Sequence, residues 1–163
     1  GYWNELEKQL ESPTLTFRGF DRNSNPTNQP INIMAAAAKA KETNCDFVIG
    51  FGGGSPMDSA KLIALAATNP GNIWDYCQKG TGGRKQPENT PLPVVCISTT
   101  AGTGSEADNS GMVTNSVTKE KLGIGFQSLF LSFPSLIRNW WFPFLRNLLH
   151  TKDLDTFFHL AEG

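Results

Sequence analysis

The chain has 163 residues, 39% of them hydrophobic and 18% charged, and its 14 basic and 15 acidic residues give a net charge of −1. This composition excludes a charged disordered tail, and the balanced charge shows no basic footprint for nucleic acid. The length suits one domain, or one domain and the start of another. Cys45, Cys77 and Cys96 lie far apart and form no CxxC pair. We therefore expect a reducing compartment, without a disulfide framework or a cysteine zinc site.

The ends of the chain and its most apolar stretch indicate whether it carries a signal peptide or a membrane span. The chain begins at Gly1 without a start methionine or a visible signal peptide, and it ends at Gly163, directly after a helical pattern. We expect it to be a fragment of a longer protein. Residues 131–149 are strongly apolar, but two arginines and two prolines interrupt them. Because a bilayer span needs about 20 clean apolar residues, we expect no transmembrane helix.

Periodicity and turn residues predict the elements of the first half of the chain. In order, they are a helix that ends at Ser12-Pro13, a strand over 15–20, a polar loop over 21–30, a helix from Pro30 to about Thr43, a strand over 46–51 and a helix that ends at Asn69-Pro70-Gly71. The run of alanines at 35–38 has high helix propensity and permits close packing against a sheet. Ser55 as N-cap, Pro56 in the first turn and Asp58 three residues past the cap predict a capping box for the last of these helices.

The second half continues the alternation. We expect a polar loop over 78–91, a buried strand over 92–98, a loop of small residues over 99–105 and two strands over 111–118 and 121–126, with no internal repeat. This order of helices and strands predicts an α/β fold with a mainly parallel sheet. Ligands of such sheets bind at the carboxyl ends of the strands, where the loops at 52–55 and 99–105 both fall.

The first candidate site is the segment GGGSPMD at 52–58. Glycines let the backbone approach an anion without an intervening Cβ, and the helix that follows directs free N–H groups at that anion. The pattern predicts pyrophosphate binding; the alternative is an ordinary turn between a strand and a helix. The dinucleotide fingerprint GxGxxG is not met, because Ser55 stands at the third glycine position, and Asp75 follows a helix and a turn rather than a second strand.

The second candidate site is TTAGTGSE at 99–106, whose hydroxyls and N–H groups could bind phosphate, ribose or a nicotinamide amide. A third is the pair Asp155 and His159, which share a helix face at a spacing of four and could bind one divalent metal. The alternative for that pair is a polar contact on an amphipathic helix, since two ligands are too few for a tight site. His150 is a conceivable third ligand.

Three segments together resemble signature segments of the iron-containing, or group III, alcohol dehydrogenases. They are GGGSPMDSAK at 52–61, TTAGTGSEAD at 99–108 and LDTFFHLAEG at 154–163. The resemblance is close over residues 1–130 and returns at 154–163. It implies a dehydroquinate synthase-like, Rossmann-like NAD(P)-binding α/β domain over 1–130, incomplete at its N-terminus. It also implies that 154–163 begin an all-helical metal-binding domain.

The resemblance also assigns roles by position. Gly53, Gly54 and Ser55 would hold the pyrophosphate, and Asp58 would lie near the nicotinamide as the catalytic candidate. Thr99, Thr100 and Thr103 would contact the adenosine and phosphate portions, and Lys121 matches a lysine that contacts the cofactor. Asp155 and His159 match the first two of four metal ligands, with iron expected and zinc the alternative.

The activity implied is NAD- or NADP-dependent interconversion of an alcohol and an aldehyde or ketone by a metal-dependent, cytoplasmic oxidoreductase, often a homo-oligomer. The partners would be small-molecule alcohols and aldehydes, with neither nucleic acid nor membrane. A divalent metal acts on the substrate oxygen as a Lewis acid, and the nicotinamide carries the hydride.

The chain departs from the family pattern at residues 131–153. A strand with a motif like FSIVDPEL is expected there, and the sequence is LSFPSLIRNWWFPFLRNLLHTKD. We hypothesise a pair of compensating frame shifts, with a genuinely divergent segment as the alternative. By resemblance, the first strand lies before Gly1 and the other two ligands lie after Gly163. We therefore predict that this chain alone has no appreciable dehydrogenase activity.

Three alternatives remain open from the sequence. The first is a zinc enzyme similar to glycerol dehydrogenase. The second is a non-catalytic nucleotide-binding remnant. The third is a structural or interaction module without a ligand.

Overall fold

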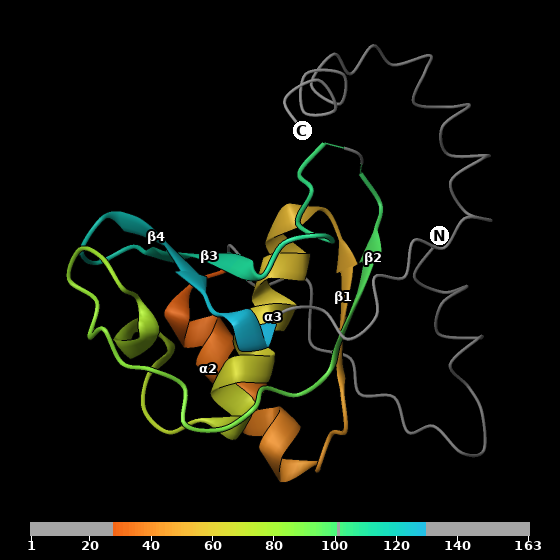
Figure 1. Cartoon of the computed structure of the whole chain (residues 1–163), viewed down its shortest axis with the longest axis horizontal. Coiled ribbons are helices and arrows are strands. Elements are labelled where there is room, and N and C mark those ends of the chain that lie inside the picture. The colour runs from red at the N-terminus through yellow and green to blue at the C-terminus, as the bar shows by residue number, and fades with distance from the viewer. Residues whose placement is uncertain (1–27, 101, 130–163) are drawn as a thin grey trace.

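The computed structural model describes residues 28–100 and 102–129. In chain order, its elements are α2 (Pro30–Glu42), β1 (Val48–Gly52), α3 (Gly54–Thr68), the 3-10 helix η1 (Ile73–Tyr76), β2 (Val94–Ser98), β3 (Ser110–Asn115), β4 (Glu120–Gly125) and the 3-10 helix η2 (Gln127–Leu129). Helix α3 lies at the centre and packs against α2, β1, β2 and β3 (Figure 1). The expected α/β architecture is therefore present in the described part of the chain.

The four described strands form two separate pairs. β1 pairs with β2 in parallel, from Val48 opposite Val94 to Gly52 opposite Ser98. β3 pairs with β4 in antiparallel, as a hairpin. The parallel sheet is confirmed for β1 and β2, while the hairpin makes a second sheet of its own. The parallel pairing requires a crossover, and α3 is part of the connection that supplies it.

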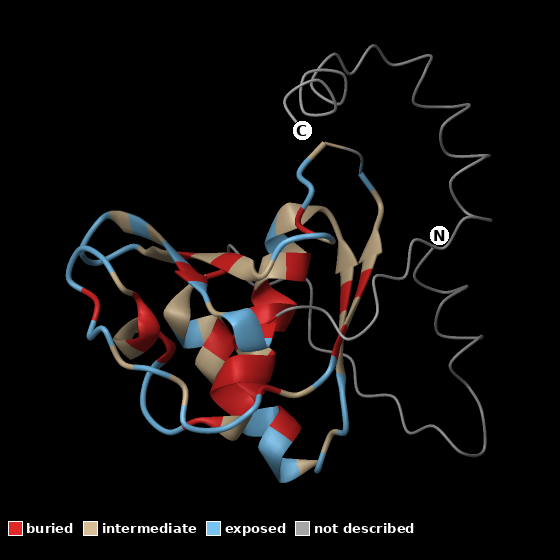
Figure 2. Ribbon diagram, in the orientation of Figure 1, coloured by how far each residue is buried: buried red, intermediate tan, exposed pale blue. Residues whose placement is uncertain are grey.

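Helix α3 is buried on most of its surface because elements cover it on several sides (Figure 2). One apolar cluster joins it to α2, η1 and the hairpin, with Leu62, Leu65 and Ile124 fully buried. A second cluster joins it to the parallel strands through residues such as Met57 and Cys96. Helix α3 is thereby held between the two sheets.

Helix α2 begins at Pro30, as expected, because a proline at the first position gives up only an N–H that has no intrahelical partner. Its buried residues recur at helical spacing on one face (Ile33, Ala36, Ala37 and Ala40). The alanine run was expected to permit close packing against a sheet, and α2 does contact β3, though less than it contacts α3. The small side chains let α2 pack chiefly against α3.

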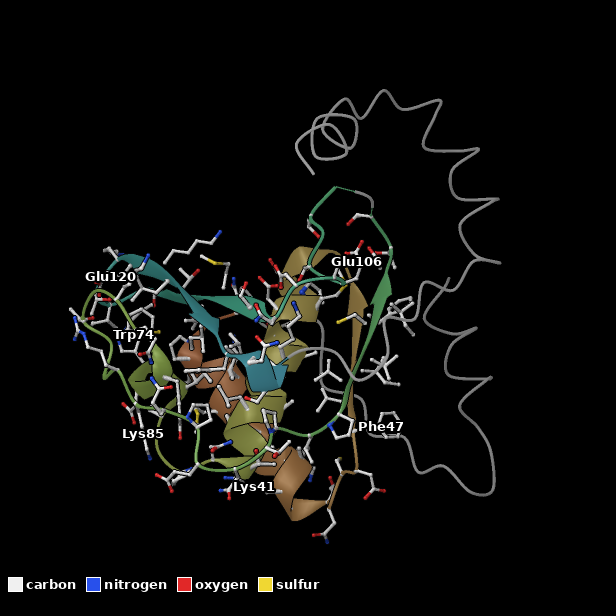
Figure 3. The ribbon with its side chains drawn as sticks, in the orientation of Figure 1. Lys41, Phe47, Trp74, Lys85, Glu106 and Glu120 are labelled. Atoms are coloured by element: carbon white, nitrogen blue, oxygen red, sulfur yellow. The ribbon has the colours of Figure 1, made fainter. Side chains whose placement is uncertain are left out.

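Long-range hydrogen bonds tie the predicted loop at 78–91 to its neighbours. Thr81 Oγ1 accepts from Trp74 Nε1 at 3.2 Å and donates to the Glu120 carboxylate at the start of β4 (Figure 3). At the other end of the loop, the buried Asn69 side chain accepts from the N–H groups of Glu88 and Asn89, each at 2.8 Å. The loop is polar, as predicted, and it is anchored at both ends.

One prediction from the sequence is wrong, and others concern residues that the structure does not describe. The capping box predicted for α3 is absent: the N-cap is Gly53, and no side chain caps this helix. The capping box that the structure does contain belongs to η1, between Asn72 and Asp75. The predicted helix and strand before residue 21, and everything predicted for 131–163, lie outside the described residues. Within them, no helix is long and apolar enough to cross a membrane.

Candidate functional site

The site begins at the carboxyl end of β1. Gly52 has a φ of +144°, and a Cβ at this position would lie 2.8 Å from Pro56 Cγ. A backbone in this region favours glycine, and the contact with the proline leaves no room for a side chain. This glycine therefore lets the chain turn directly from β1 into α3.

The two small-residue loops meet at this point. Thr99 N donates to Gly52 O at 2.9 Å, which carries the parallel pairing one residue past β2. A Cβ on Gly53 would lie 3.0 Å from Thr100 Oγ1, and a Cβ on Gly54 would lie 3.1 Å from Thr103 Cγ2. The proximity predicted from the sequence is confirmed for these loops. Each glycine lets a threonine of the other loop come close to the backbone.

The start of α3 supplies backbone donors to this place. The first N–H groups of a helix have no intrahelical acceptor, and the helix dipole adds partial positive charge there. Gly54 and Ser55 contribute such groups, while Pro56 has none, and Met57 N makes a long bond of 3.4 Å to Gly53 O. Ser55 is exposed beside them. This arrangement can bind an anion such as a phosphate.

Asp58 is turned away from the backbone of its own helix end. Its Oδ1 accepts from Ser105 Oγ at 2.5 Å, and its Oδ2 accepts from Met112 N at 3.0 Å. The carboxylate therefore bridges the second loop and β3. Because α3 begins at Gly54, Ser55 lies inside the first turn and is not the N-cap, so the predicted capping box does not form. The Asp58 carboxylate is bound by these two long-range donors instead.

Lys61, one helical turn after Asp58, was not predicted as a site residue. Its ammonium is fully buried and donates to Asp108 Oδ1 at 2.6 Å, to Ser110 O at 2.8 Å and to Ser105 Oγ at 3.4 Å. A buried ammonium is costly unless it is paired and hydrogen-bonded. Its three acceptors come from the second loop, from the start of β3 and from the segment that joins them. The sequence signal was a single lysine within an otherwise small and apolar run, SAKLIALAA.

Acidic groups gather around the same place. Burial raises the pKa of the Cys96 thiol to about 11, opposed by the Lys61 charge and assisted by Glu106, Asp58 and Asp108. Glu106 lies in the loop after β2 (Figure 3). Its Oε2 is buried without a hydrogen-bond partner in the described part of the chain. Among the described residues, this buried oxygen therefore lacks the donor that such a group ordinarily has.

The other predicted site residues fall elsewhere. Lys121 is an exposed residue of β4 that pairs with Thr114, four residues along β3 from Ser110, so about 13 Å of strand separates it from the Lys61 cluster. Asp155 and His159 lie outside the described residues. Among those that are described, no group of three or more His, Cys, Asp or Glu side chains could hold a metal ion.

Comparison with known proteins places this chain in a family. The model of the family "Iron-containing alcohol dehydrogenase" matches residues 1–134, a range that does not reach Asp155 or His159. The chain is 37% identical over 124 residues to alcohol dehydrogenase 4 of Saccharomyces cerevisiae, covering 76% of this chain and 31% of that protein. It is 44% identical over 124 residues to an NAD-dependent methanol dehydrogenase of Bacillus methanolicus, again covering 76% and 31%.

Solved structures agree with the sequence matches. An NADH-dependent butanol dehydrogenase of Thermotoga maritima superposes with a TM-score of 0.70 at 29% identity, covering 79% of this chain and 31% of that structure. The chain thus spans less than a third of the length of each of these relatives. Since the family match extends over most of the sequence and both glycine-rich segments lie within it, this chain belongs to the iron-containing alcohol dehydrogenase family.

Proposed function

We propose that this chain is the nucleotide-binding part of an NAD(P)-dependent alcohol dehydrogenase that interconverts small alcohols and their aldehydes or ketones. The observation that carries the proposal is the meeting of two glycine-rich loops beside the start of α3, at the carboxyl ends of two parallel strands. The names of the relatives, which include NAD-dependent and NADH-dependent dehydrogenases, support the choice of cofactor. They favour NAD over NADP.

The residues present fit a dinucleotide. Side chains are absent from Gly53 and Gly54, so a pyrophosphate can reach the N–H groups at the start of α3. Thr100 and Thr103 are exposed beside these glycines and offer hydroxyls to phosphate or ribose oxygens. The free oxygen of Glu106 can accept from a ribose hydroxyl or a carboxamide. Asp58 is held by two donors, and we assign it the task of fixing the loop beside the nicotinamide rather than of moving a proton.

The hydride chemistry belongs to the nicotinamide, and an iron-type metal would polarise the substrate oxygen. We assign Asp155 and His159 to that metal, together with ligands from the rest of the protein. The described residues bind and orient the nucleotide and supply no metal cluster. For this reason we expect the 163-residue chain alone to bind nucleotide without appreciable turnover. An alcohol-dependent rise in NADH absorbance with ferrous or zinc ion present would contradict that expectation.

A fluorescence titration with NADH tests the proposal. We expect the chain to bind NADH and Gly53→Ala to weaken binding at least tenfold, which corresponds to about 1.4 kcal/mol. Gly123→Ala is the matched control, because a Cβ there would make an ordinary contact of 3.5 Å with Met112 Sδ. Equal affinity of the two variants, or no binding by the parent chain, would contradict the proposal.

A second variant distinguishes a clash of the new methyl group with Thr100 from a clash of that group with the bound nucleotide. The Cβ of Gly53→Ala would press on Thr100 Oγ1, and the double variant Gly53→Ala/Thr100→Ala relieves that contact. We expect the double variant to bind NADH less well than Thr100→Ala alone, because the new methyl still blocks the pyrophosphate. If the two bound equally, Gly53 would serve only to accommodate Thr100.

A further inference from the structure

We infer that Asp108, acting through the buried ammonium of Lys61, is a positioning residue that holds the second glycine-rich loop in the conformation that binds nucleotide. This inference rests on the proposed function for its ligand. Neither residue was assigned a role by the sequence patterns, and neither lies among the groups proposed to touch the cofactor.

The first step of the argument is the burial of Lys61. Its side chain is 0% exposed, while that of Asp108 is 50% exposed. A buried charge must be compensated by hydrogen-bonded partners, and removing one partner is costly because the other charge remains buried. Asp108 is the closest acceptor of this ammonium, at 2.6 Å, and the one that brings a negative charge. It also accepts from Ser110 N at 3.0 Å, which fixes its own orientation.

The second step is the continuity of the hydrogen bonds. Ser105 Oγ donates to Asp58 Oδ1 and accepts from Lys61 Nζ, so one buried hydroxyl connects both charged residues of α3. Asp58 in turn accepts from Met112 N. Asp58 and Lys61 therefore hold the segment from Ser105 to Met112 against one turn of the helix.

The third step connects this segment to the nucleotide site. Thr103, two residues before Ser105, lies against Gly54 at the start of α3. Ser105 N bonds back to Thr103 Oγ1 at 3.4 Å, and Ala107 N bonds to Gly104 O at 2.8 Å. A displacement of Ser105 would therefore move Thr103 with it. Loss of the Lys61–Asp108 pair should loosen the loop where it faces the nucleotide, although Asp108 itself is not placed there.

Hydrogen exchange of the 163-residue chain without nucleotide gives the first readout. We expect Asp108→Ala to speed exchange of the amides at 103–112 by roughly tenfold, with exchange at 73–86 unchanged. Glu42→Ala is the matched control, because it removes an acid from an exposed ion pair, with Lys39 at 3.0 Å, on another helix. Unchanged exchange at 103–112 would overturn the inference whether or not the chain binds nucleotide.

NADH affinity gives the second readout. We expect Asp108→Ala to raise the dissociation constant by roughly tenfold and Glu42→Ala to leave it unchanged. The double variant Lys61→Met/Asp108→Ala removes the buried charge together with its partner, so it should regain thermal stability lost in the single variant. Its affinity for NADH should stay low, since Ser105 and Ser110 have still lost the ammonium.

These results separate a positioning role from a purely structural one. If affinity recovered in the double variant together with stability, the pair would act on folding alone, and the inference would be wrong. If the parent chain bound no NADH, the proposed function would fail, and with it the part of the inference that concerns affinity. Faster exchange at 103–112 would then still show that the Lys61–Asp108 pair holds this loop in place.

Discussion

Gly50 in β1 offers a sharp test of how closely the parallel sheet packs on α3. A Cβ at this position would lie 2.9 Å from both Ala60 Cβ and Met57 Cα, about half an ångström inside ordinary contact. The obstructing atoms are backbone, or are bonded directly to it, so no side-chain rotation relieves the clash. Gly50→Ala therefore forces the strand and the helix apart.

The magnitude follows from two opposing effects. Overpacking of this kind costs about 1–3 kcal/mol. Gly50 has no positive φ, so its backbone accepts alanine without strain. Alanine also lowers the entropy of the unfolded chain, which stabilises the folded state by about 0.5–1 kcal/mol. The difference between these two effects is about 0–2.5 kcal/mol, so we expect a net loss of about 1 kcal/mol in the free energy of unfolding. With a urea dependence of about 2 kcal/mol per molar, the midpoint falls by roughly 0.5 M.

The assay is urea unfolding followed by far-UV circular dichroism, which reports on α2 and α3. Gly123→Ala is the control, since it has the same entropic gain and only an ordinary contact at 3.5 Å from Met112 Sδ. Its midpoint should stay the same or rise by a few tenths of a molar. A midpoint for Gly50→Ala equal to that of the control would show that β1 and α3 are not packed as described.

Two further predictions concern the buried thiols and the buried amide of Asn69, which is compared with an exposed helix cap. Burial raises the pKa of the Cys77 and Cys96 thiols from 9.0 to about 11. The folded chain therefore keeps protons that the unfolded chain releases, and unfolding titrations should show stability falling as the pH rises from 9 to 11, a fall that Cys→Ala variants should lessen. Asn69→Ala, which removes a buried amide that accepts two backbone N–H groups at 2.8 Å, should cost about 2–3 kcal/mol by urea titration. Asn72→Ala, which removes the cap of η1, should cost only about 1 kcal/mol, and the reverse order would contradict this account.

Local patterns predicted most of the described elements. The helix expected from Pro30 to about Thr43 is α2, and the strand expected over 46–51 is β1, displaced by one or two residues. The two strands expected over 111–118 and 121–126 form the β3–β4 hairpin, with a longer turn than predicted. These features depend on periodicity and on proline, glycine and polar turns, which act over a few residues.

Interactions between distant segments explain what the sequence did not predict. The capping box at Asp58 was locally plausible, but Ser105 and Met112, far along the chain, bind that carboxylate instead. The partners of Lys61 lie a similar distance away, with 47 positions separating it from Asp108. The glycine-rich loops were found because adjacent parallel strands end at the same edge, a rule that needs no knowledge of side-chain packing.

The long connection between β1 and β2 has a consequence for the order of folding. The β3–β4 hairpin closes over a short turn, an event of about 1–10 μs for isolated hairpins. The strands β1 and β2 are joined through α3, η1 and a long loop, so their pairing must first overcome the entropy of closing that connection. Both loops of the proposed nucleotide site follow the carboxyl ends of these two strands. Competence to bind nucleotide should therefore arise late in refolding, after the hairpin and the helices have formed.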